Sequence, residues 1–277
     1  MIKEKGKSIV SKKIIKILGD DFLEHTDAIA VEEPLQISIS VLKADSPITN
    51  KNISITMRTP GHDKDLAIGF LFTEGIIQAS NQIKKVAHDE NSINVQLINS
   101  ENIDLGKLER HFYTSSSCGV CGKASIEAIK TICRLPPSAA DFQIEKNLIK
   151  SFPRILKQEQ NIFNNTGGIH AAALFSFKGE LIAMREDVGR HNALDKIIGH
   201  LLTQNLLPLD YHLLFLSGRA SFELIQKAAM AGIHFIMAVG APSSLAVEMA
   251  VEHDITLIGF LNETRYNIYT GSKRIKI

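Results

Sequence analysis

Two cysteines three residues apart are the clearest sign of chemistry in this sequence. Cys118 and Cys121 stand in a stretch of small polar residues and glycines between positions 114 and 122. Two thiols at this spacing can form a disulfide, share a metal ion or relay a sulfur atom. Lys123 and the helix predicted just downstream would favour the thiolate. We expect an exposed, adaptable loop with reactive cysteines, because inert thiols normally lie on apolar elements.

Zinc binding is one alternative for this pair. A closed structural zinc site needs four ligands, and His170 and His191 are candidates for the other two. The zinc deaminases place a His-x-Glu segment before their Pro-Cys-x-x-Cys, whereas here the cysteines come first. Ala172 stands where the catalytic glutamate would be, so deaminase chemistry is not expected. A zinc-stabilised interaction protein stays open as an alternative.

A dithiol oxidoreductase is the second alternative. Thioredoxin-like proteins carry the CxxC motif at the start of a helix, early in a small βαβ fold. Here the motif follows an α+β unit and a long polar loop, which disfavours a disulfide relay without removing it from consideration.

Three turns that follow predicted strands form a second group of candidates. They comprise residues 217–221, 240–244 and 259–265. In an open α/β sheet such turns meet at the carboxyl edge, where ligands generally bind. Helix N-termini offer free N–H groups there, and Arg219 and Arg265 offer positive charge. We expect a phosphate-containing ligand such as a nucleotide, the alternative being that the small residues merely cap helices.

Charged residues are also concentrated at the end of another predicted strand. Glu186, Asp187, Arg190 and His191 fall within six positions. They could be catalytic, or they could form an ion-pair network that holds the start of the following helix. The sequence leaves both interpretations open.

The hydrophobic pattern predicts the elements that position these residues. The C-terminal half alternates strand and helix, which is typical of a layered α/β fold whose parallel sheet is covered on both faces. Its expected elements are a hairpin at 171–177 and 180–185, strands at 213–216, 235–239 and 256–259, and helices at 190–202, 221–231 and 243–252. Another helix is expected through Leu148, Ile149 and Phe152.

The N-terminal half predicts a smaller α+β unit. Strands are expected at 35–41, 53–57, 85–88 and 93–98, with a helix that begins at Asp63 as its N-cap and stops at Gly75. Six lysines in the first sixteen positions suggest a mobile basic tail, with an edge strand as the alternative. The expected divisions are a tail at 1–26, the α+β subdomain at 27–112, the CxxC loop at 113–123 and the α/β domain at 124–277.

Composition narrows the class of protein. The chain has 277 residues, 44% of them hydrophobic, so a sizeable core is available. A net charge of +1 argues against bulk nucleic-acid binding. No apolar run approaches the roughly 20 residues of a membrane helix, and no secretory signal is visible. We expect a cytoplasmic protein without membrane insertion, in which Cys133 packs into the core on the apolar side of a helix predicted over 123–133.

The CxxC motif, the charged segment at 186–191 and the turns at 217–221 and 259–265 make the sequence recognisable. In these segments it resembles the FdhD/NarQ family, the sulfurtransferase accessory proteins of formate dehydrogenases. The longest matching segment is Glu186–Lys196, and it is far more specific than the CxxC motif. Further matching segments are 117–122, 168–172, 217–221, 245–248, 257–260 and 267–270.

The resemblance implies a particular activity. Such proteins take persulfide sulfur from a cysteine desulfurase and pass it to the molybdenum (or tungsten) bis(guanine dinucleotide) cofactor of formate dehydrogenase. The persulfide cysteine falls on Cys118, with Cys121 as the companion thiol. The resemblance also implies a core like the cytidine-deaminase fold, a homodimer, and no tightly bound metal of the protein's own.

The implied cofactor-binding stretch coincides with the third of the turns described above. It consists of Phe260, Leu261, Asn262, Glu263, Thr264 and Arg265. Guanine-nucleotide phosphates would suit the arginines, so the first turn joins the candidate site through Ser217, Gly218, Arg219 and Ser221.

Overall fold

The computed structural model of the chain describes residues 8–43, 46–98 and 142–276. The predicted CxxC loop, the helix expected over 123–133 and all three cysteines lie outside the described residues. The predictions for Cys118, Cys121 and Cys133 therefore stay predictions. Within the described residues, no helix is long and apolar enough to cross a membrane.

A six-stranded sheet forms the centre of the C-terminal half. Its strands are β8 (His170–Ser176), β9 (Leu181–Asp187), β10 (His212–Leu216), β11 (Phe235–Ala238), β12 (Thr256–Gly259) and β13 (Asn267–Thr270), in the order β13-β12-β11-β10-β8-β9. The expected parallel sheet is only partly present, because β10, β11 and β12 are parallel whereas β8, β9 and β13 pair antiparallel. The predicted hairpin, with Gly179 in its turn at φ 90°, accounts for β9 lying antiparallel beside β8.

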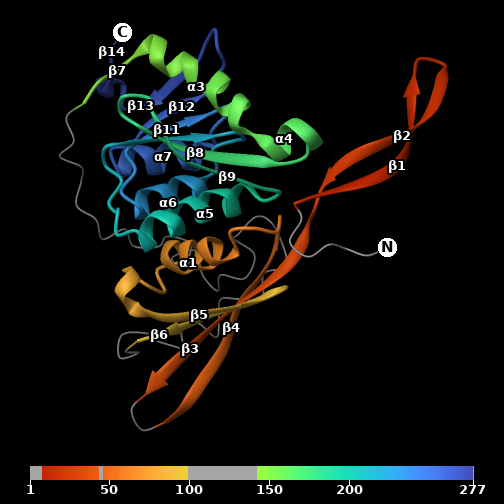
Figure 1. Cartoon of the computed structure of the whole chain (residues 1–277). Helices are drawn as coiled ribbons and strands as arrows, with labels where there is room; N and C mark the ends of the chain where they lie inside the picture. Colours follow the sequence, from red (N-terminus) through yellow and green to blue (C-terminus); the bar gives the residue numbers. More distant parts are fainter. Residues whose placement is uncertain (1–7, 44–45, 99–141, 277) are drawn as a thin grey trace.

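Helices cover both faces of this sheet (Figure 1). The helices are α3 (Lys146–Glu159), α4 (Asn161–Thr166), α5 (Arg190–Thr203), α6 (Phe222–Met230) and α7 (Ser244–Glu252). Leu214 and Leu216 of β10 pack into the cluster that contains α5, α6 and α7, whereas Leu213 and Phe215 pack into the cluster with α3. Because side chains alternate along a strand, burial on both faces requires the near-continuous apolar strands of the sequence.

The N-terminal half contributes a four-stranded sheet and one helix to the same core. Its elements are β3 (Glu33–Lys43), β4 (Ser46–Arg58), β5 (Ile83–Asp89), β6 (Ser92–Leu97) and α1 (Asp63–Thr73), with strand order β4-β3-β6-β5. The strands confirm the four predicted in the sequence. Leu35, Ile37 and Ile39 of β3 belong to the hydrophobic cluster that also contains α5 and α6, so one core joins the two halves.

Shorter elements complete the described chain. They are the 3-10 helices η1 (Ser80–Gln82) and η3 (Ser272–Arg274), and the pair β7 (Ile144–Glu145) and β14 (Ile275–Lys276), which is parallel.

Asp63 is not the N-cap that the sequence predicts. The N-cap is His62, in the left-handed conformation at φ 58° and without a side-chain cap, and Asp63 is the first helical residue. The Asp63 carboxylate instead accepts two hydrogen bonds from the buried Arg58, at 3.0 and 2.9 Å. The acid was recognised as a helix-start signal, but a charged partner only five residues upstream satisfies it. The predicted stop is confirmed, since Gly75 follows the helix at φ 72°.

The part of the expected basic tail that the structure describes is a β-hairpin, in keeping with the edge-strand alternative. β1 (Ile9–Leu18) and β2 (Asp21–Ala30) pair antiparallel over ten residues each. Gly19, at φ 63°, opens the two-residue turn between them, and Gly-Asp is a favoured hairpin turn. The Gly19-Asp20 pair is therefore the signal in the sequence that identifies this hairpin.

Candidate functional site

The three predicted turns lie side by side at the carboxyl edge of β10, β11 and β12. The Gly240 N–H donates to the Gly218 carbonyl at 3.0 Å, and the Phe260 N–H donates to the Gly240 carbonyl at 3.2 Å. Ala220 and Ala241 add a further backbone hydrogen bond, from N–H to carbonyl, at 3.2 Å. The predicted convergence of the turns is confirmed, while their binding of a ligand stays a prediction.

Glycine is required at the junction of these turns because the backbones approach so closely. A Cβ atom at Gly240 would lie 2.9 Å from the Cα of Arg219, closer than real Cβ contacts. A Cβ atom at Gly259 would lie 2.9 Å from both Pro242 Cδ and Tyr269 Cε2. A larger side chain at either glycine would therefore push the neighbouring turns apart.

Asn262 organises the third turn. Its side-chain oxygen accepts hydrogen bonds from the N–H groups of Thr264 and Arg265, each at 2.9 Å, and from the Thr264 hydroxyl at 2.8 Å. Phe260 enters the turn at φ 53°, a conformation that is uncommon for an aromatic residue. Its side chain is 40% exposed, whereas Leu261 is buried in the core. The side chain of Leu261 therefore supports the turn from beneath and faces no ligand.

The polar side chains available for a ligand at these turns are exposed. Arg219 and Arg265 are exposed, as are Glu263 and Thr264. Ser217 is engaged, since its hydroxyl accepts a hydrogen bond from the Ala171 N–H at 2.7 Å. The first and third turns thus present one exposed arginine each.

The start of β8 brings His170 to the same edge. His170 pairs with Asp187 in the β8–β9 ladder, and a Cβ atom at Gly218 would lie 3.2 Å from His170 Nδ1. Burial lowers the pKa of His170, and Arg190 and His191 lower it further, against an opposing effect of Asp187. The lowered pKa favours the neutral form of the His170 imidazole.

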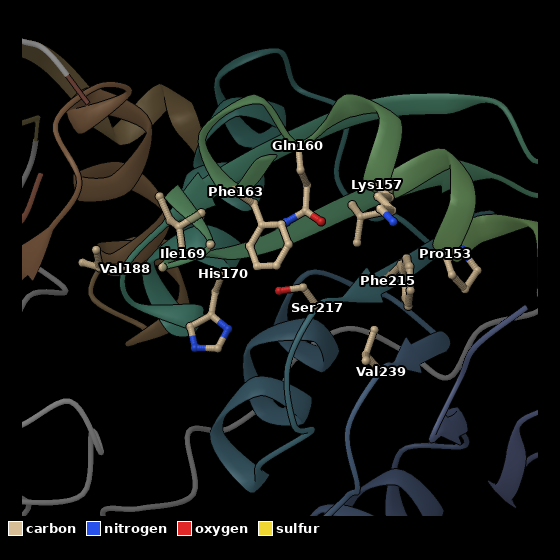
Figure 2. Close-up of a pocket in the computed structure, with 13 residues that line it drawn as sticks. Pro153, Lys157, Gln160, Phe163, Ile169, His170, Val188, Phe215, Ser217 and Val239 are labelled. Carbon is tan, nitrogen blue, oxygen red and sulfur yellow. The ribbon is translucent and has the colours of Figure 1, made fainter. Parts of the chain in front are cut away.

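A pocket of about 440 Å³ opens beside these residues (Figure 2). Its wall is mostly apolar, and its polar side chains are Lys157, Gln160, His170 and Ser217. Gln160 is only 5% exposed, and its Nε2 has no hydrogen-bond partner among the described residues. Figure 2 shows the Gln160 amide directed into the space between Phe163 and Ser217. The pocket therefore contains a hydrogen-bond donor of Gln160 that no described residue accepts, inside a mostly apolar cavity.

Glu186 positions a wall of this pocket. Its two carboxylate oxygens accept the N–H groups of Ile162 and Phe163 at the start of α4, at 2.9 and 2.8 Å. An acid that accepts the free N–H groups of a helix N-terminus fixes that helix. Glu186 thus holds α4, which carries the pocket residue Phe163.

Asp187 forms a buried network that connects the two halves of the chain. Its carboxylate lies 2.7 Å from Lys196 Nζ and accepts the Thr59 N–H at 3.1 Å. The Gly189 N–H and the Asn192 amide donate to its other oxygen at 2.8 and 3.1 Å. Of the two interpretations of this charged segment, the ion-pair network accounts for Asp187.

His191 is engaged at the start of α6. Its Nε2 lies 2.8 Å from a carboxylate oxygen of Glu223 and 3.3 Å from the Ser221 hydroxyl. Neither His170 nor His191 belongs to a cluster of three metal-ligating side chains, and the described ranges contain no such cluster.

A second buried network escaped sequence reasoning altogether. Lys227 Nζ lies 2.9 Å from the Asp195 carboxylate. It also donates a hydrogen bond to the Thr73 hydroxyl at 2.8 Å, and that hydroxyl donates to Asp195 at 2.9 Å. Burial raises the pKa of Asp195. Burial lowers the pKa of Lys227, but Asp195 and Glu74 outweigh it and the net shift is upward. No periodic pattern marks these residues, because their partners lie more than 30 positions away. The Gln160 donor is likewise not predictable from the sequence, because the pocket that surrounds it is formed by segments far apart in the chain.

The fold is that of an α/β protein in which three turns meet at one edge of the sheet, and comparison with known proteins gives its family. The chain matches the FdhD/NarQ family over residues 30–276. It is 43% identical over 275 residues to the sulfur carrier protein FdhD of Mycolicibacterium paratuberculosis, covering 95% of this chain and 97% of that protein. It is 44% identical over 266 residues to the sulfur carrier protein FdhD of Picrophilus torridus, covering 96% and 98%.

A solved structure supports the same assignment. The crystal structure of a protein from Desulfotalea psychrophila, described as a formate dehydrogenase accessory protein, superposes with a TM-score of 0.74 at 25% sequence identity. The match covers 98% of this chain and 100% of that chain. The chain belongs to the FdhD/NarQ family.

Proposed function

We propose that this chain is a sulfur carrier that receives sulfur from a cysteine desulfurase and delivers it to the molybdenum or tungsten bis(guanine dinucleotide) cofactor of formate dehydrogenase. The carrier role and the link to formate dehydrogenase follow family membership and the relatives at about 40% identity. The observation that carries the binding step is the junction of the turns at 217–221 and 259–265, which places two exposed arginines at one sheet edge.

The proposed first step is a thiol exchange. The Cys118 thiolate attacks the outer sulfur of the desulfurase persulfide and forms a new S–S bond, while the bond between the two sulfurs of the desulfurase breaks. The desulfurase cysteine leaves as a thiolate, and Cys118 becomes the persulfide, so neither an oxidant nor a reductant is needed. Cys121 assists the receipt or the release of this sulfur.

The proposed second step is the binding of the anionic cofactor as substrate. Free N–H groups and arginine side chains suit phosphates. Arg219 and Arg265 supply the charge, and Asn262 keeps the backbone of the third turn in place. The pocket beside Ser217 adjoins the first turn and offers the volume for a further part of the ligand. The proposed framework for both steps is a core of the cytidine-deaminase type.

Mass spectrometry tests the sulfur-transfer step. After incubation with a desulfurase and cysteine, the intact chain gains one sulfur that reductant removes. Cys118→Ala loses this gain, whereas Cys133→Ala keeps it and serves as the matched control. An equal gain in Cys118→Ala would contradict the assignment. A protein stabilised by zinc would instead contain stoichiometric metal, and a dithiol oxidoreductase would reduce a disulfide substrate.

Thermal unfolding tests the binding step. A ligand that binds only the folded state raises its stability, so saturating GDP is expected to raise Tm. Arg265→Ala and Arg219→Ala reduce this rise, and Lys85→Ala, an exposed cation on β5, leaves it unchanged. The binding site would be contradicted if GDP did not raise the Tm of the unaltered chain. It would also be contradicted if GDP raised the Tm of both arginine variants as much as that of the unaltered chain.

A further inference from the structure

The pocket beside the first turn has the size and the wall of a site for a small molecule. Its volume of about 440 Å³ lies within the roughly 300–1,000 Å³ that is usual for such sites. Leu156, Phe163, Ile169, Phe215 and Val239 form much of its apolar wall. A wall of this kind suits a ring, whereas phosphates suit the exposed arginines of the neighbouring turns.

The junction of α3 and α4 places Gln160 at this pocket. Gln160 follows the last residue of α3 and precedes the first residue of α4, and its backbone N–H and carbonyl are both hydrogen-bonded within these helices. Its side chain makes no capping hydrogen bond to α4. Glu186 already accepts the N–H groups at the start of that helix, so the Gln160 amide is not needed there.

The Gln160 amide is buried without a use in the described part of the fold. The residue is only 5% exposed, and no described residue accepts a hydrogen bond from Nε2. Buried polar groups in proteins are normally hydrogen-bonded, because an unsatisfied donor costs stability. Figure 2 shows the amide directed into the pocket. A ligand that presents an acceptor to Nε2 would satisfy this donor.

Ser217 supplies a second donor to the same pocket. Its hydroxyl oxygen accepts a hydrogen bond from the Ala171 N–H at 2.7 Å. A hydroxyl that accepts a hydrogen bond still carries a proton to donate. Ser217 and Gln160 both line the pocket, so their donors face one ligand. Together they favour a ring with two acceptors.

Among the purines, this pattern of donors selects the 6-oxopurines. Guanine presents the O6 carbonyl and the N7 ring nitrogen as adjacent acceptors, whereas adenine presents an amino group in place of O6. An adenine amino group would set a donor against a donor. Phe163 is 39% exposed, and its ring offers a surface on which any base can stack. Stacking would therefore supply affinity, and the donors would supply the choice of base.

We propose that this pocket is the subsite for the guanine ring of the ligand, and that Gln160 is a specificity-determining residue whose Nε2 donates to the O6 carbonyl. The inference rests on the proposed function, which places a guanine nucleotide at the turns. Ser217 begins the first turn and also lines the pocket, so one nucleotide can reach both the pocket and Arg219.

Isothermal titration calorimetry of the full chain with three nucleotides tests this proposal. Inosine diphosphate (IDP) keeps O6 and N7 and lacks only the 2-amino group of GDP. GDP and IDP are therefore expected to bind with Kd values within about three-fold of each other. ADP is expected to bind at least ten-fold more weakly than GDP, because a site built around hydrogen bonds discriminates strongly against an unmatched group.

Three variants separate the choice of base from the affinity for any base. Gln160→Met removes the donor at similar volume, so the Kd of GDP rises by about five- to ten-fold while that of ADP changes little. Phe163→Leu weakens GDP and ADP by a similar factor, of about five-fold, because stacking does not depend on the base. Gln158→Met is the matched control, since Gln158 is exposed on α3 and does not line the pocket. Circular dichroism and Tm show whether each variant is folded.

The outcomes distinguish this inference from the proposed function on which it rests. If the unaltered chain bound no GDP, both would be contradicted. Equal binding of GDP and ADP by the unaltered chain would overturn the inference alone, and so would IDP binding ten-fold more weakly than GDP. A Gln160→Met chain that weakened GDP and ADP equally would show that Gln160 only supports the fold, and this result would also overturn the inference.

Discussion

Lys196 Nζ lies 2.7 Å from the Oδ2 atom of Asp187, and both side chains are almost completely buried, at 1% and 0% exposure. The pair joins the end of β9 to the middle of α5 and also binds the backbone of Thr59, which follows β4. It therefore ties the loop after β4 to the edge of the six-stranded sheet that carries the candidate site.

Removing one member of this pair should destabilise the protein severely. Lys196→Met leaves the Asp187 carboxylate buried without its counter-charge, and such a change typically costs about 3–5 kcal/mol. Urea unfolding measures the loss. The matched control is Lys276→Met, which breaks a pair of the same 2.7 Å length whose side chains are 63% and 62% exposed, and it should leave the free energy of unfolding almost unchanged. Equal losses in the two variants would show that burial does not set the strength of the pair.

The crossing of α1 and α5 depends on two glycines. A Cβ atom at Gly199 would collide with the Asp65 carbonyl, and a Cβ atom at Gly69 would collide with that of Asp195. Gly199→Ala should therefore lower the free energy of unfolding by about 1–3 kcal/mol, although alanine is the better helix former. Gly168→Ala, where the nearest atom is 3.8 Å away, should be neutral or slightly stabilising. A stabilised Gly199→Ala would contradict the close packing of the helices.

Glu186→Gln should loosen α4 selectively. The carboxylate is replaced by an amide, which keeps one acceptor oxygen for the N–H groups of Ile162 and Phe163 and loses the charge that suits a helix N-terminus. Hydrogen exchange of these two amides is expected to quicken, while the amides of α5 exchange as before. Unchanged protection at Ile162 and Phe163 would mean that Glu186 does not hold the helix.

Stability should fall as the pH is lowered from about 7 towards 5. Burial and then Arg274 lower the pKa of His234, against an opposing effect of Asp254. The unfolded chain therefore takes up this proton first as the pH drops through the usual histidine range, which favours unfolding. Burial lowers the pKa of His212 in the same direction. Urea unfolding at the two pH values measures this loss of stability. The midpoints should differ less in His234→Gln than in the unaltered chain, and an equal difference would show that His234 does not contribute to the pH dependence.

The sequence predicts the strands and helices of the described residues well where they are local and periodic. The strands of the six-stranded sheet need burial on both faces, and the pattern of β10 shows this directly through Leu213, Leu214, Phe215 and Leu216. The orientation of these strands is harder to predict, because the direction of β8 relative to β10 depends on a connection that contains β9 and α5. The sheet is mixed for that reason, and not parallel.

The candidate site is also predictable only in part. The order of strands brings the three turns together, so Gly218, Gly240 and Phe260 could be grouped from the sequence. Pairings between distant residues, such as Lys227 with Thr73, could not be predicted, because no pattern in either segment indicates which residue the other segment contributes. Leu261 shows a further limit, since a residue within a predicted binding segment can instead face the core.

The third turn gives the sharpest test of the binding site, because one side chain makes three of its hydrogen bonds. The Asn262 oxygen accepts three hydrogen bonds, from Thr264 N, Thr264 Oγ1 and Arg265 N. Asn262→Ala removes all three and keeps the backbone hydrogen bond from the residue 262 N–H to the Arg265 carbonyl, so the backbone that would face a phosphate becomes more mobile. Thr264→Val removes only the hydroxyl and keeps both backbone contacts.

The two variants should therefore form a graded series in the rise of Tm with saturating GDP. The rise is expected to be largest in the unaltered chain, slightly smaller in Thr264→Val and smallest in Asn262→Ala. Without nucleotide the Tm of all three should differ little, because residues 262–265 are exposed and a surface turn contributes little to the core. If Asn262→Ala lowered Tm without nucleotide by as much as it lowered the nucleotide-dependent rise, the turn would be a structural element only. If it left the rise unchanged, the nucleotide would bind elsewhere.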